Sequence, residues 1–329
     1  MSARPAPSEG FARILLTGGA GFVGAHLRRR LALAYPQAEC LLTVRASSEA
    51  AGLDWPAVEA DVADFAAVEA VVARFRPDLV VHLAAQSSVA ASLDGAEETW
   101  RVNFDGTFNL ARASARLEHG VTFFFVSSAE VYGESFRGGD VTEETPLRPG
   151  NAYARSKAAA EHMLLDVLPP ESPLIVARPF NHTGAGQAPA FVMPSFAAQI
   201  AAIEDGRRPA RILVGNLEAE RDFLDVNDVC GAYMSLLAAA SRLPNRFVVN
   251  VSSGTSYRIG DLLNALATLA LVPFAIEVDS SRLRSSDIPR AAGSNVRLLS
   301  STSWRKTTPI EETLASVLAH ARAQRRDGA

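Results

Sequence analysis

Cysteine and histidine are scarce in this 329-residue sequence. The two cysteines, Cys40 and Cys230, both lie in apolar runs, where a thiol usually acts as a small buried hydrophobe. Two such residues argue against a disulfide framework and against a thiolate metal site. The six histidines show no spacing typical of metal ligands. We therefore expect a protein that holds no metal.

Long hydrophobic runs are also lacking. No uninterrupted apolar stretch is long enough to span a bilayer, and the opening residues MSARPAPSEG contain no apolar core for a signal peptide or an anchor. We expect residues 1–11 to form a disordered tail and the protein to be cytoplasmic.

Charge of one sign is not in excess. The formal net charge of −4 gives no electrostatic reason to expect nucleic acid or a membrane as partner. The one notable basic cluster, Arg28 to Arg30, lies in an apparent helix and is interpreted as a solvated helix face. A chain of this length, with 48% apolar and 21% charged residues, suits one large α/β unit or two domains.

Short β-rich runs alternate with helical patterns through the first half of the chain. The expected strands are 13–17, 40–44, 79–83, 121–127 and 174–178. The expected helices are 23–34, 65–75, 97–118 and 153–168. Most of the strands are continuously apolar, as is typical of strands covered on both faces. The repetition predicts an α/β fold with a doubly wound parallel sheet, a Rossmann fold.

The pattern changes after Phe180. Glycine and proline become frequent, and helices then alternate with shorter strands such as 212–214 and 247–251. We interpret residues 12–180 as an NAD(P)-binding Rossmann domain. We interpret residues 181–329 as a smaller α/β substrate-binding lobe, partly interleaved with the Rossmann sheet.

A glycine-rich turn follows the first expected strand. Gly18, Gly21 and Gly24 form a GxxGxxG pattern that ends this strand and opens a helix. In a dinucleotide-binding turn such glycines allow the tight turn, the close approach of the pyrophosphate and the close packing of helix on strand. The pyrophosphate then faces the helix N-terminus, whose free N–H groups and dipole favour an anion.

The end of the second expected strand bears on the type of dinucleotide. NAD normally meets an acidic residue there, about 20 residues past the glycines. This sequence has Arg45 in that region instead, followed by Ser47 and Ser48. A guanidinium and two hydroxyls suit a 2′-phosphate, so NADP(H) is favoured and NAD(H) is left open. Asp61 is interpreted as an acceptor for the adenine amino group or, alternatively, as the cap of a helix that begins at Val62.

Tyr153 and Lys157 are four residues apart in an expected helix, so they lie on one face, one turn apart. A nearby ammonium lowers the pKa of a phenol, which would let Tyr153 exchange a proton with a sugar hydroxyl or carbonyl. Ser127 and Ser128 end the preceding strand, at the carboxyl edge where such sheets bind ligands. The arrangement predicts a catalytic acid/base at Tyr153.

These motifs occur in the order and spacing of the extended short-chain dehydrogenase/reductase family, the NAD-dependent epimerases and dehydratases, which the chain resembles from Arg13 onward. The resemblance also rests on the segments Leu83-Ala84-Ala85-Gln86, Val102 to Thr107 and Ser127 to Gly133. It implies that Ser128 orients the substrate oxygen, that Tyr153 transfers the proton and that Lys157 also holds the nicotinamide ribose. The cofactor site that it implies further contains Gly18, Gly21, Phe22, Val23, Gly24, Asp61, Val62, Leu83, Ala84, Ala85 and Asn103. Ser88 and Glu130 would contact the substrate.

Two segments in the second half of the chain narrow the expected class of substrate. Arg178 to Gly184 and Val214 to Phe223 are similar to segments of the GDP-6-deoxy-4-keto-mannose reductases, which form GDP-rhamnose. This similarity places Asn181, Arg221 and Arg284 at the substrate diphosphate, and guanidinium forks suit a pyrophosphate. The leading hypothesis is NAD(P)H-dependent reduction of the C4 ketone of a GDP-4-keto-6-deoxyhexose.

The alternative hypothesis is a nucleotide-sugar 4,6-dehydratase or C4-epimerase that keeps its cofactor bound and recycles the hydride. Ala129 argues against the dehydratase, because related dehydratases often carry a proton-donating Asp or Ser there, before a glutamate that matches Glu130. A non-catalytic cofactor-sensing protein on the same fold is a third interpretation. Such a protein would have little need for Ser128, Tyr153 and Lys157 together.

A homodimer is the expected assembly. The expected helices 97–118 and 153–168 are long and rich in alanine, and in the family that the chain resembles the equivalent pair forms a four-helix bundle across a two-fold axis. Closed two-fold dimers are also the commonest soluble assembly.

Overall fold

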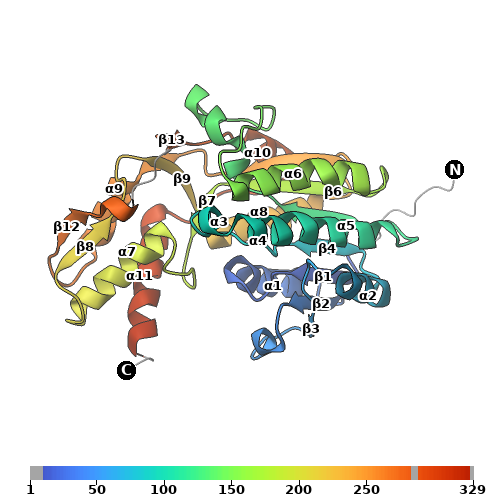
Figure 1. Ribbon diagram of the computed structural model, residues 1–329, viewed down its shortest axis with the longest axis horizontal. Coiled ribbons are helices and arrows are strands. Elements are labelled where there is room, and N and C mark those ends of the chain that lie inside the picture. Colours follow the sequence, from blue (N-terminus) through green and yellow to red (C-terminus); the bar gives the residue numbers. More distant parts are fainter. Residues whose placement is uncertain (1–9, 283–287, 327–329) are drawn as a thin grey trace.

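A seven-stranded sheet forms the centre of the computed structural model, which describes residues 10–282 and 288–326 (Figure 1). Its strands, in spatial order, are β10 (Arg246–Val251), β6 (Leu174–Pro179), β5 (Thr122–Val126), β4 (Leu79–His82), β1 (Arg13–Thr17), β2 (Glu39–Val44) and β3 (Ala57–Glu59). Each neighbouring pair is parallel. The strand order therefore reverses between β1 and β4, and a reversal of this kind opens a crevice at the carboxyl ends of the strands.

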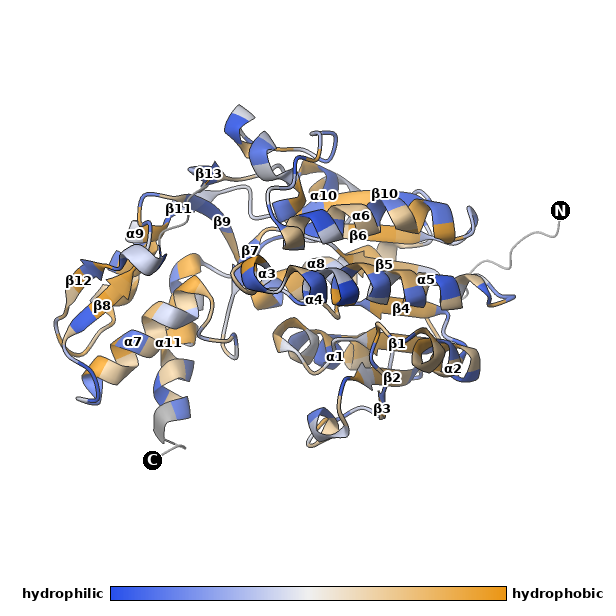
Figure 2. Ribbon diagram, viewed as in Figure 1, coloured by the Kyte–Doolittle hydropathy of each residue, from blue (hydrophilic) through white to orange (hydrophobic). Residues whose placement is uncertain are grey.

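Helices cover both faces of this sheet. One face packs on α1 (Phe22–Ala34) and α8 (Val226–Ala239). The other packs on α2 (Phe65–Phe75), α5 (Gly106–Ala115) and α6 (Ala152–Val167). Figure 2 shows apolar strands enclosed between helices whose outer faces are hydrophilic. The apolar runs in the sequence are thus explained by burial on both faces, and the predicted doubly wound α/β fold is confirmed.

A smaller lobe follows β6 and lies at one end of the large sheet (Figure 1). Its core is formed by α7 (Val192–Glu204), β8 (Arg211–Val214), α9 (Ile259–Thr268) and α11 (Ile310–Arg326). Its strands form a sheet of β11 (Ser256–Arg258), β9 (Glu220–Asp225), β13 (Arg290–Ala291) and β7 (Asn181–Thr183), and a parallel pair of β8 with β12 (Ala275–Val278). Short helical segments complete the described chain: η1 (Ser47–Ala50), α3 (Ala91–Asp94), α4 (Ala96–Trp100), η2 (Arg101–Asp105), η3 (Ala129–Gly138), η4 (Ser280–Arg282) and α10 (Val296–Ser301).

The large sheet and the lobe are interleaved. Strand β10 and helix α8 lie beyond residue 181 in the chain, yet β10 pairs with β6 and α8 packs on the large sheet. Residues 12–180 and 181–329 remain proposed units, and β10 and α8 are the parts of the second unit that join the sheet of the first. Residues 1–9 of the proposed tail lie outside the described residues. In the described part of the chain, no helix is both long and apolar enough to cross a membrane.

One expected helix is wrong. Residues 97–118 do not form a single α-helix, because a π turn, η2, separates α4 from α5. The buried Asn103 lies in this turn, where its side chain binds the backbone of Gln86 and the hydroxyl of Ser156. A π turn inserts one extra residue into a helix and is frequent at functional sites. The extra residue turns Asn103 toward the loop after β4.

Candidate active site

The glycine-rich turn lies between β1 and α1, as the sequence predicts. Gly18 has φ +70°, and a Cβ atom there would lie 2.6 Å from the backbone nitrogen of Ala84. A Cβ on Gly24 would lie 2.4 Å from the carbonyl oxygen of Gly18. Gly21 precedes α1 without a side-chain cap, so the amides of Phe22 and Val23 are left for an outside acceptor. The turn has the geometry of an anion site at a helix N-terminus.

Hydrogen bonds join this turn to the end of β4. The backbone nitrogen of Leu83 donates to the Thr17 carbonyl at 3.1 Å, and that of Ala84 donates to the Thr17 hydroxyl at 3.2 Å. His82 lies within 2.6 Å of the Thr17 hydroxyl and 3.0 Å of the Thr107 hydroxyl. Burial, with the nearby charge of Lys157, lowers the pKa of His82 to about 3, so its ring is neutral. His82, which belongs to none of the sequence motifs, thus joins β4 to the end of β1 and to α5.

Asp61 follows β3, the strand at one edge of the large sheet. Its carboxylate accepts from the backbone of Ala63 at 3.0 Å and from Arg101 at 2.8 Å. The alternative role as cap of a helix at Val62 is wrong, because α2 begins at Phe65 and Asp64 caps it. Arg101 was missed by the sequence analysis. It begins the π turn η2 and reaches Asp61 from 40 residues further along the chain.

Two of the three residues expected to meet a 2′-phosphate, Arg45 and Ser47, are paired with carboxylates. Arg45 pairs with Glu49 at 3.1 Å. The backbone nitrogen of Ser47 donates to Glu59 at 2.9 Å, and the Ser47 hydroxyl donates to the same carboxylate. These bonds hold the pKa of Glu59 below its usual range. Glu59 lies on β3, so its approach to Ser47 follows from the pairing of β3 with β2. Ser48 lies beside Ser47 in the same short turn.

The expected Ser–Tyr–Lys group comes together at the carboxyl end of β5. Asn151 caps α6 by accepting from the backbone of Ala154 at 2.8 Å, which fixes the start of the helix that carries Tyr153. Ser128 lies close enough to Tyr153 to lower the pKa of its phenol, and the Lys157 ammonium donates to the Val126 carbonyl at 2.8 Å. Tyr153 and Lys157 are both buried, with 8% and 2% exposure.

The expected effect of Lys157 on the pKa of Tyr153 is wrong. Burial raises the pKa of Tyr153 to about 12, against the lowering effect of Ser128, and the charge of Glu130 raises it further. Burial also lowers the pKa of Lys157 to about 7, opposed by the charge of Glu161. Desolvation penalises the charged form of both groups and outweighs their proximity. Tyr153 is therefore protonated at neutral pH, as a proton donor must be.

The expected substrate residues are divided between the large sheet and the lobe. Ser88 follows β4 and accepts from the backbone of Ala91, and Glu130 follows Ser128 in η3. Asn181 of β7 is exposed and pairs with Phe223, two residues from Arg221 on β9. Arg221 donates to the carbonyls of Glu220 and Ile288, each at 2.8 Å. Arg284 lies outside the described residues.

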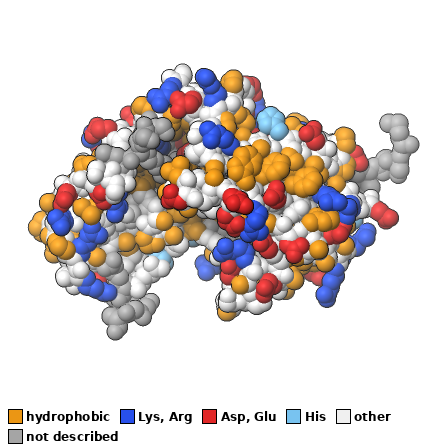
Figure 3. All heavy atoms as spheres, in the orientation of Figure 1, with side chains coloured by type: hydrophobic (Ala, Val, Ile, Leu, Met, Phe, Trp, Pro, Cys, Tyr) orange, Lys and Arg blue, Asp and Glu red, His pale blue; other side chains and the backbone are white. Residues whose placement is uncertain are grey.

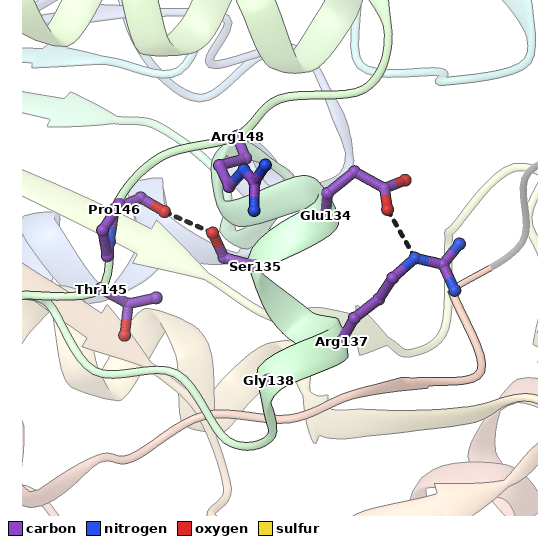
Figure 4. A pocket seen from close by; sticks show the side chains of 7 residues that line it. All are labelled: Glu134, Ser135, Arg137, Gly138, Thr145, Pro146 and Arg148. Carbon is purple, nitrogen blue, oxygen red and sulfur yellow. Dashed lines mark hydrogen bonds and ion pairs between the residues drawn. The ribbon is translucent and has the colours of Figure 1, made fainter.

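A hollow of about 570 Å³ lies beside η3 (Figure 4). Its lining includes the Glu134–Arg137 ion pair and Arg148. None of the site residues predicted from the sequence is among the lining residues. We place the candidate site at the carboxyl edge of the sheet, where the chemistry-bearing side chains and the glycine-rich turn meet. No cluster of three or more His, Cys, Asp or Glu that could hold a metal ion occurs among the described residues.

Comparison with known proteins identifies the family. Residues 14–252 match the NAD dependent epimerase/dehydratase family. The chain belongs to this family. It is 36% identical over 312 residues to GDP-6-deoxy-D-mannose reductase of Pseudomonas aeruginosa, covering 93% of this chain and 96% of that protein. It is 29% identical over 297 residues to GDP-6-deoxy-D-talose 4-dehydrogenase of Aggregatibacter actinomycetemcomitans, covering 87% of this chain and 90% of that protein.

A solved structure of the family has the same fold. The structure of RMD from Pseudomonas aeruginosa complexed with NADPH superposes with a TM-score of 0.80 at 33% identity, covering 95% of this chain and 99% of that one. The family predicted from the motifs is thus confirmed. The chain is an NAD(P)-dependent oxidoreductase of this family.

Proposed function

We propose that this protein reduces the C4 ketone of a GDP-4-keto-6-deoxyhexose with NADPH to give a GDP-6-deoxyhexose such as GDP-D-rhamnose. The observation that supports this most is the buried group of Ser128, Tyr153 and Lys157 beside a dinucleotide-binding turn. The near-full-length similarity to a GDP-6-deoxy-D-mannose reductase supports the substrate class. NADP(H) is favoured because RMD, a close structural neighbour, is complexed with NADPH.

The described residues fit a dinucleotide. The space between Gly18, Gly24 and the start of α1 is one that a Cβ atom would fill, and the free amides of α1 suit a pyrophosphate. We propose that the walls of this site are formed by Phe22, Val23, Asp61, Val62, Leu83, Ala84, Ala85 and Asn103. When bound there, the reduced nicotinamide supplies the hydride that the ketone carbon accepts.

The side chains at the end of β5 would complete the reduction. Ser128 would hold the ketone oxygen, and Tyr153 would donate its proton to that oxygen as negative charge develops on it. Lys157, fixed by the Val126 carbonyl, would hold the nicotinamide ribose beside them. We propose that Asn181, Arg221 and Arg284 bind the substrate diphosphate, and that Ser88 and Glu130 contact the sugar.

Turnover of the ketone tests the proposal. Purified protein is mixed with freshly made GDP-4-keto-6-deoxymannose and NADPH or NADH, and the absorbance of the reduced cofactor is followed. The expected result is oxidation of NADPH with formation of a 6-deoxyhexose, whose configuration at C4 is then assigned by NMR. Absence of oxidation with both cofactors would refute the proposal. Conversion of GDP-mannose or a UDP-sugar without added cofactor would support a dehydratase or epimerase instead.

Glu59 is expected to limit the affinity for NADPH. Its carboxylate occupies the Ser47 donors that a 2′-phosphate would use, so the phosphate must displace a negative charge. The substitution Glu59→Gln removes the charge and is expected to lower KM for NADPH several-fold while leaving KM for NADH nearly unchanged. Glu39→Gln, on the same sheet but outside the expected site, serves as the control. An equal change with both cofactors would show that Glu59 does not sense the phosphate.

We propose that the protein forms a homodimer through the face of α3, α4 and α6. Three large apolar side chains are exposed there, Leu93 (66%), Trp100 (37%) and Leu165 (49%). Figure 3 shows hydrophobic side chains gathered over this part of the molecule. Apolar patches of this kind favour protein contacts, and two copies would cover each other across a two-fold axis. Light scattering should give twice the monomer mass, falling to the monomer mass in the double variant Trp100→Glu/Leu165→Glu. A monomeric wild type would refute the dimer.

A further inference from the structure

Glu161 continues the stripe of α6 that carries the two expected catalytic side chains. Tyr153, Lys157 and Glu161 follow one another at intervals of four residues, so they share one face of the helix. This face meets three consecutive residues at the end of β5. Tyr153 lies beside Ser128, Lys157 donates to the Val126 carbonyl, and Glu161 accepts from the Ser127 hydroxyl. Glu161 has no role in the proposed chemistry.

Glu161 is also the centre of a buried polar network. Arg178 of β6 donates to both of its carboxylate oxygens, with contacts of 3.0 Å and 2.5 Å. Arg178 donates in turn to the Tyr132 hydroxyl at 2.9 Å, and Tyr132 donates to Asn250 at 2.7 Å. Glu161 and Arg178 are 6% and 5% exposed, and Tyr132 and Asn250 are fully buried. The network therefore joins α6 to β5, β6, η3 and β10.

We propose that Glu161 is a positioning residue for the reduction. It fixes α6 on the end of β5 so that the Tyr153 hydroxyl meets Ser128, and it supplies the counter-charge that keeps Lys157 protonated. Its kinetic consequences rest on the proposed function, whereas its effect on the placement of α6 does not.

Among the charged groups near Lys157, Glu161 is the one that stabilises its protonated form. The titratable groups near Lys157 are Tyr153 and Glu161 on α6 and the neutral His82 on β4, and the Phe125 ring of β5 lies 4.8 Å from its ammonium. Of these, Glu161 is the group whose charge favours the ammonium. Burial has already lowered the pKa of Lys157 to about 7, so loss of the carboxylate would lower it further. Lys157 would then lose its proton below neutral pH.

The variant Glu161→Gln tests whether Glu161 positions the catalytic side chains. A double variant separates an effect on their position from an effect on the stability of the fold. Removal of one partner of a buried ion pair is strongly destabilising, whereas replacement of both by apolar residues of similar volume often is not. The pair Glu161→Leu/Arg178→Met should therefore regain much of the wild-type Tm. We expect kcat to remain about tenfold to 100-fold low, since small misplacements have such effects. We also expect KM for NADPH to change little, and the alkaline fall in rate to move to lower pH. Recovery of kcat together with Tm would overturn the proposal.

A milder substitution, Ser127→Ala, also tests the role of Glu161, and Ser114→Ala is its matched control. Ser127→Ala removes one hydrogen bond to Glu161 and leaves the ion pair in place. Ser114 of α5 is a buried serine whose hydroxyl has no hydrogen-bond partner in the described part of the chain. We expect Ser127→Ala to lower kcat several-fold and Ser114→Ala to leave it unchanged. Equal rates for both variants and the wild type would count against the proposal.

Amide hydrogen exchange tests the positioning role of Glu161 without relying on turnover of the keto-sugar. In NADPH-loaded protein, the apolar double variant should exchange faster than wild type over residues 152–157 and 127–131, and at the wild-type rate in β8 and β12. If wild-type protein does not reduce the keto-sugar, the proposed function fails, and this exchange pattern alone decides the positioning role. Unchanged exchange over residues 152–157 would refute it.

Discussion

Phenylalanine in place of Tyr153 is expected to lower kcat for ketone reduction by about 10²–10⁴-fold, the usual contribution of a positioned general acid. The substitution removes only the phenol hydroxyl, which lies beside Ser128. KM for NADPH should change little, because Tyr153→Phe leaves the glycine-rich turn and its amides intact. Stopped-flow measurement of single turnovers would separate the reduction step from product release.

Tyr35→Phe is the control for this substitution. Tyr35 lies at the end of α1, where it packs against Phe11, so its hydroxyl is not expected to take part in the reaction. If Tyr153→Phe keeps the wild-type kcat, another group must donate the proton.

The pH dependence of the rate follows from the same geometry. Burial raises the pKa of Tyr153 to about 12, so Tyr153 keeps its proton at neutral and mildly alkaline pH. The pKa of Lys157 is about 7, so a fall in rate as pH rises through neutrality reports loss of the Lys157 proton. Reduction is therefore expected to be fastest on the acidic side of neutrality, as a profile of kcat against pH would show.

Alanine in place of Gly18 is expected to weaken NADPH binding by about 10- to 100-fold, which corresponds to about 1–3 kcal/mol of forced repacking. Two effects combine at this position. Gly18 has φ +70°, and its Cβ would lie 2.6 Å from the Ala84 nitrogen and 2.9 Å from the Leu83 carbonyl carbon. The turn can accept a methyl group only by moving away from the end of β4, which also displaces the amides at the start of α1.

Gly52→Ala separates these two effects. Gly52 has φ +74°, nearly the conformation of Gly18, but a Cβ there would meet nothing within 4 Å. Both alanines therefore carry the conformational cost of a left-handed residue, and the Gly18 variant alone carries the close approach. Fluorescence titration of NADPH and urea denaturation of each variant would measure the difference. Equal effects at the two positions would show that the contact with β4 does not matter.

Local patterns in the sequence predicted much of the sheet and the core of the site. The glycine turn and the four-residue spacing of Tyr153 and Lys157 are each contained within one element and its neighbour, so periodicity and turn chemistry suffice to find them. That Ser128 and Tyr153 meet follows from the general rule that the carboxyl ends of parallel strands share one edge.

Contacts made across the sheet were not predictable in this way. Glu59 reaches Ser47 through the pairing of β3 with β2, and Arg101 reaches Asp61 through a π turn that has no recognised signal in the sequence. No motif in the sequence marked Glu161, because its partner Arg178 lies on a strand 17 residues further along. The direction of the pKa shift at Tyr153 was also not predicted. Burial outweighs the nearby charge there, and residue spacing does not reveal burial.

The place of β10 at the edge of the large sheet also bears on how the chain folds during synthesis. Residues 246–251 can pair with β6 only after the first part of the lobe, which begins at residue 181, has been made. Until then β6 presents an unpaired edge, and until residues 226–239 have been made the apolar face that α8 covers is open to water. Such late, long-range pairing makes folding slow and leaves a nascent intermediate prone to association. A fragment that stops at residue 180 would retain every residue of the dinucleotide turn and would still lack the strand and helix that close its sheet.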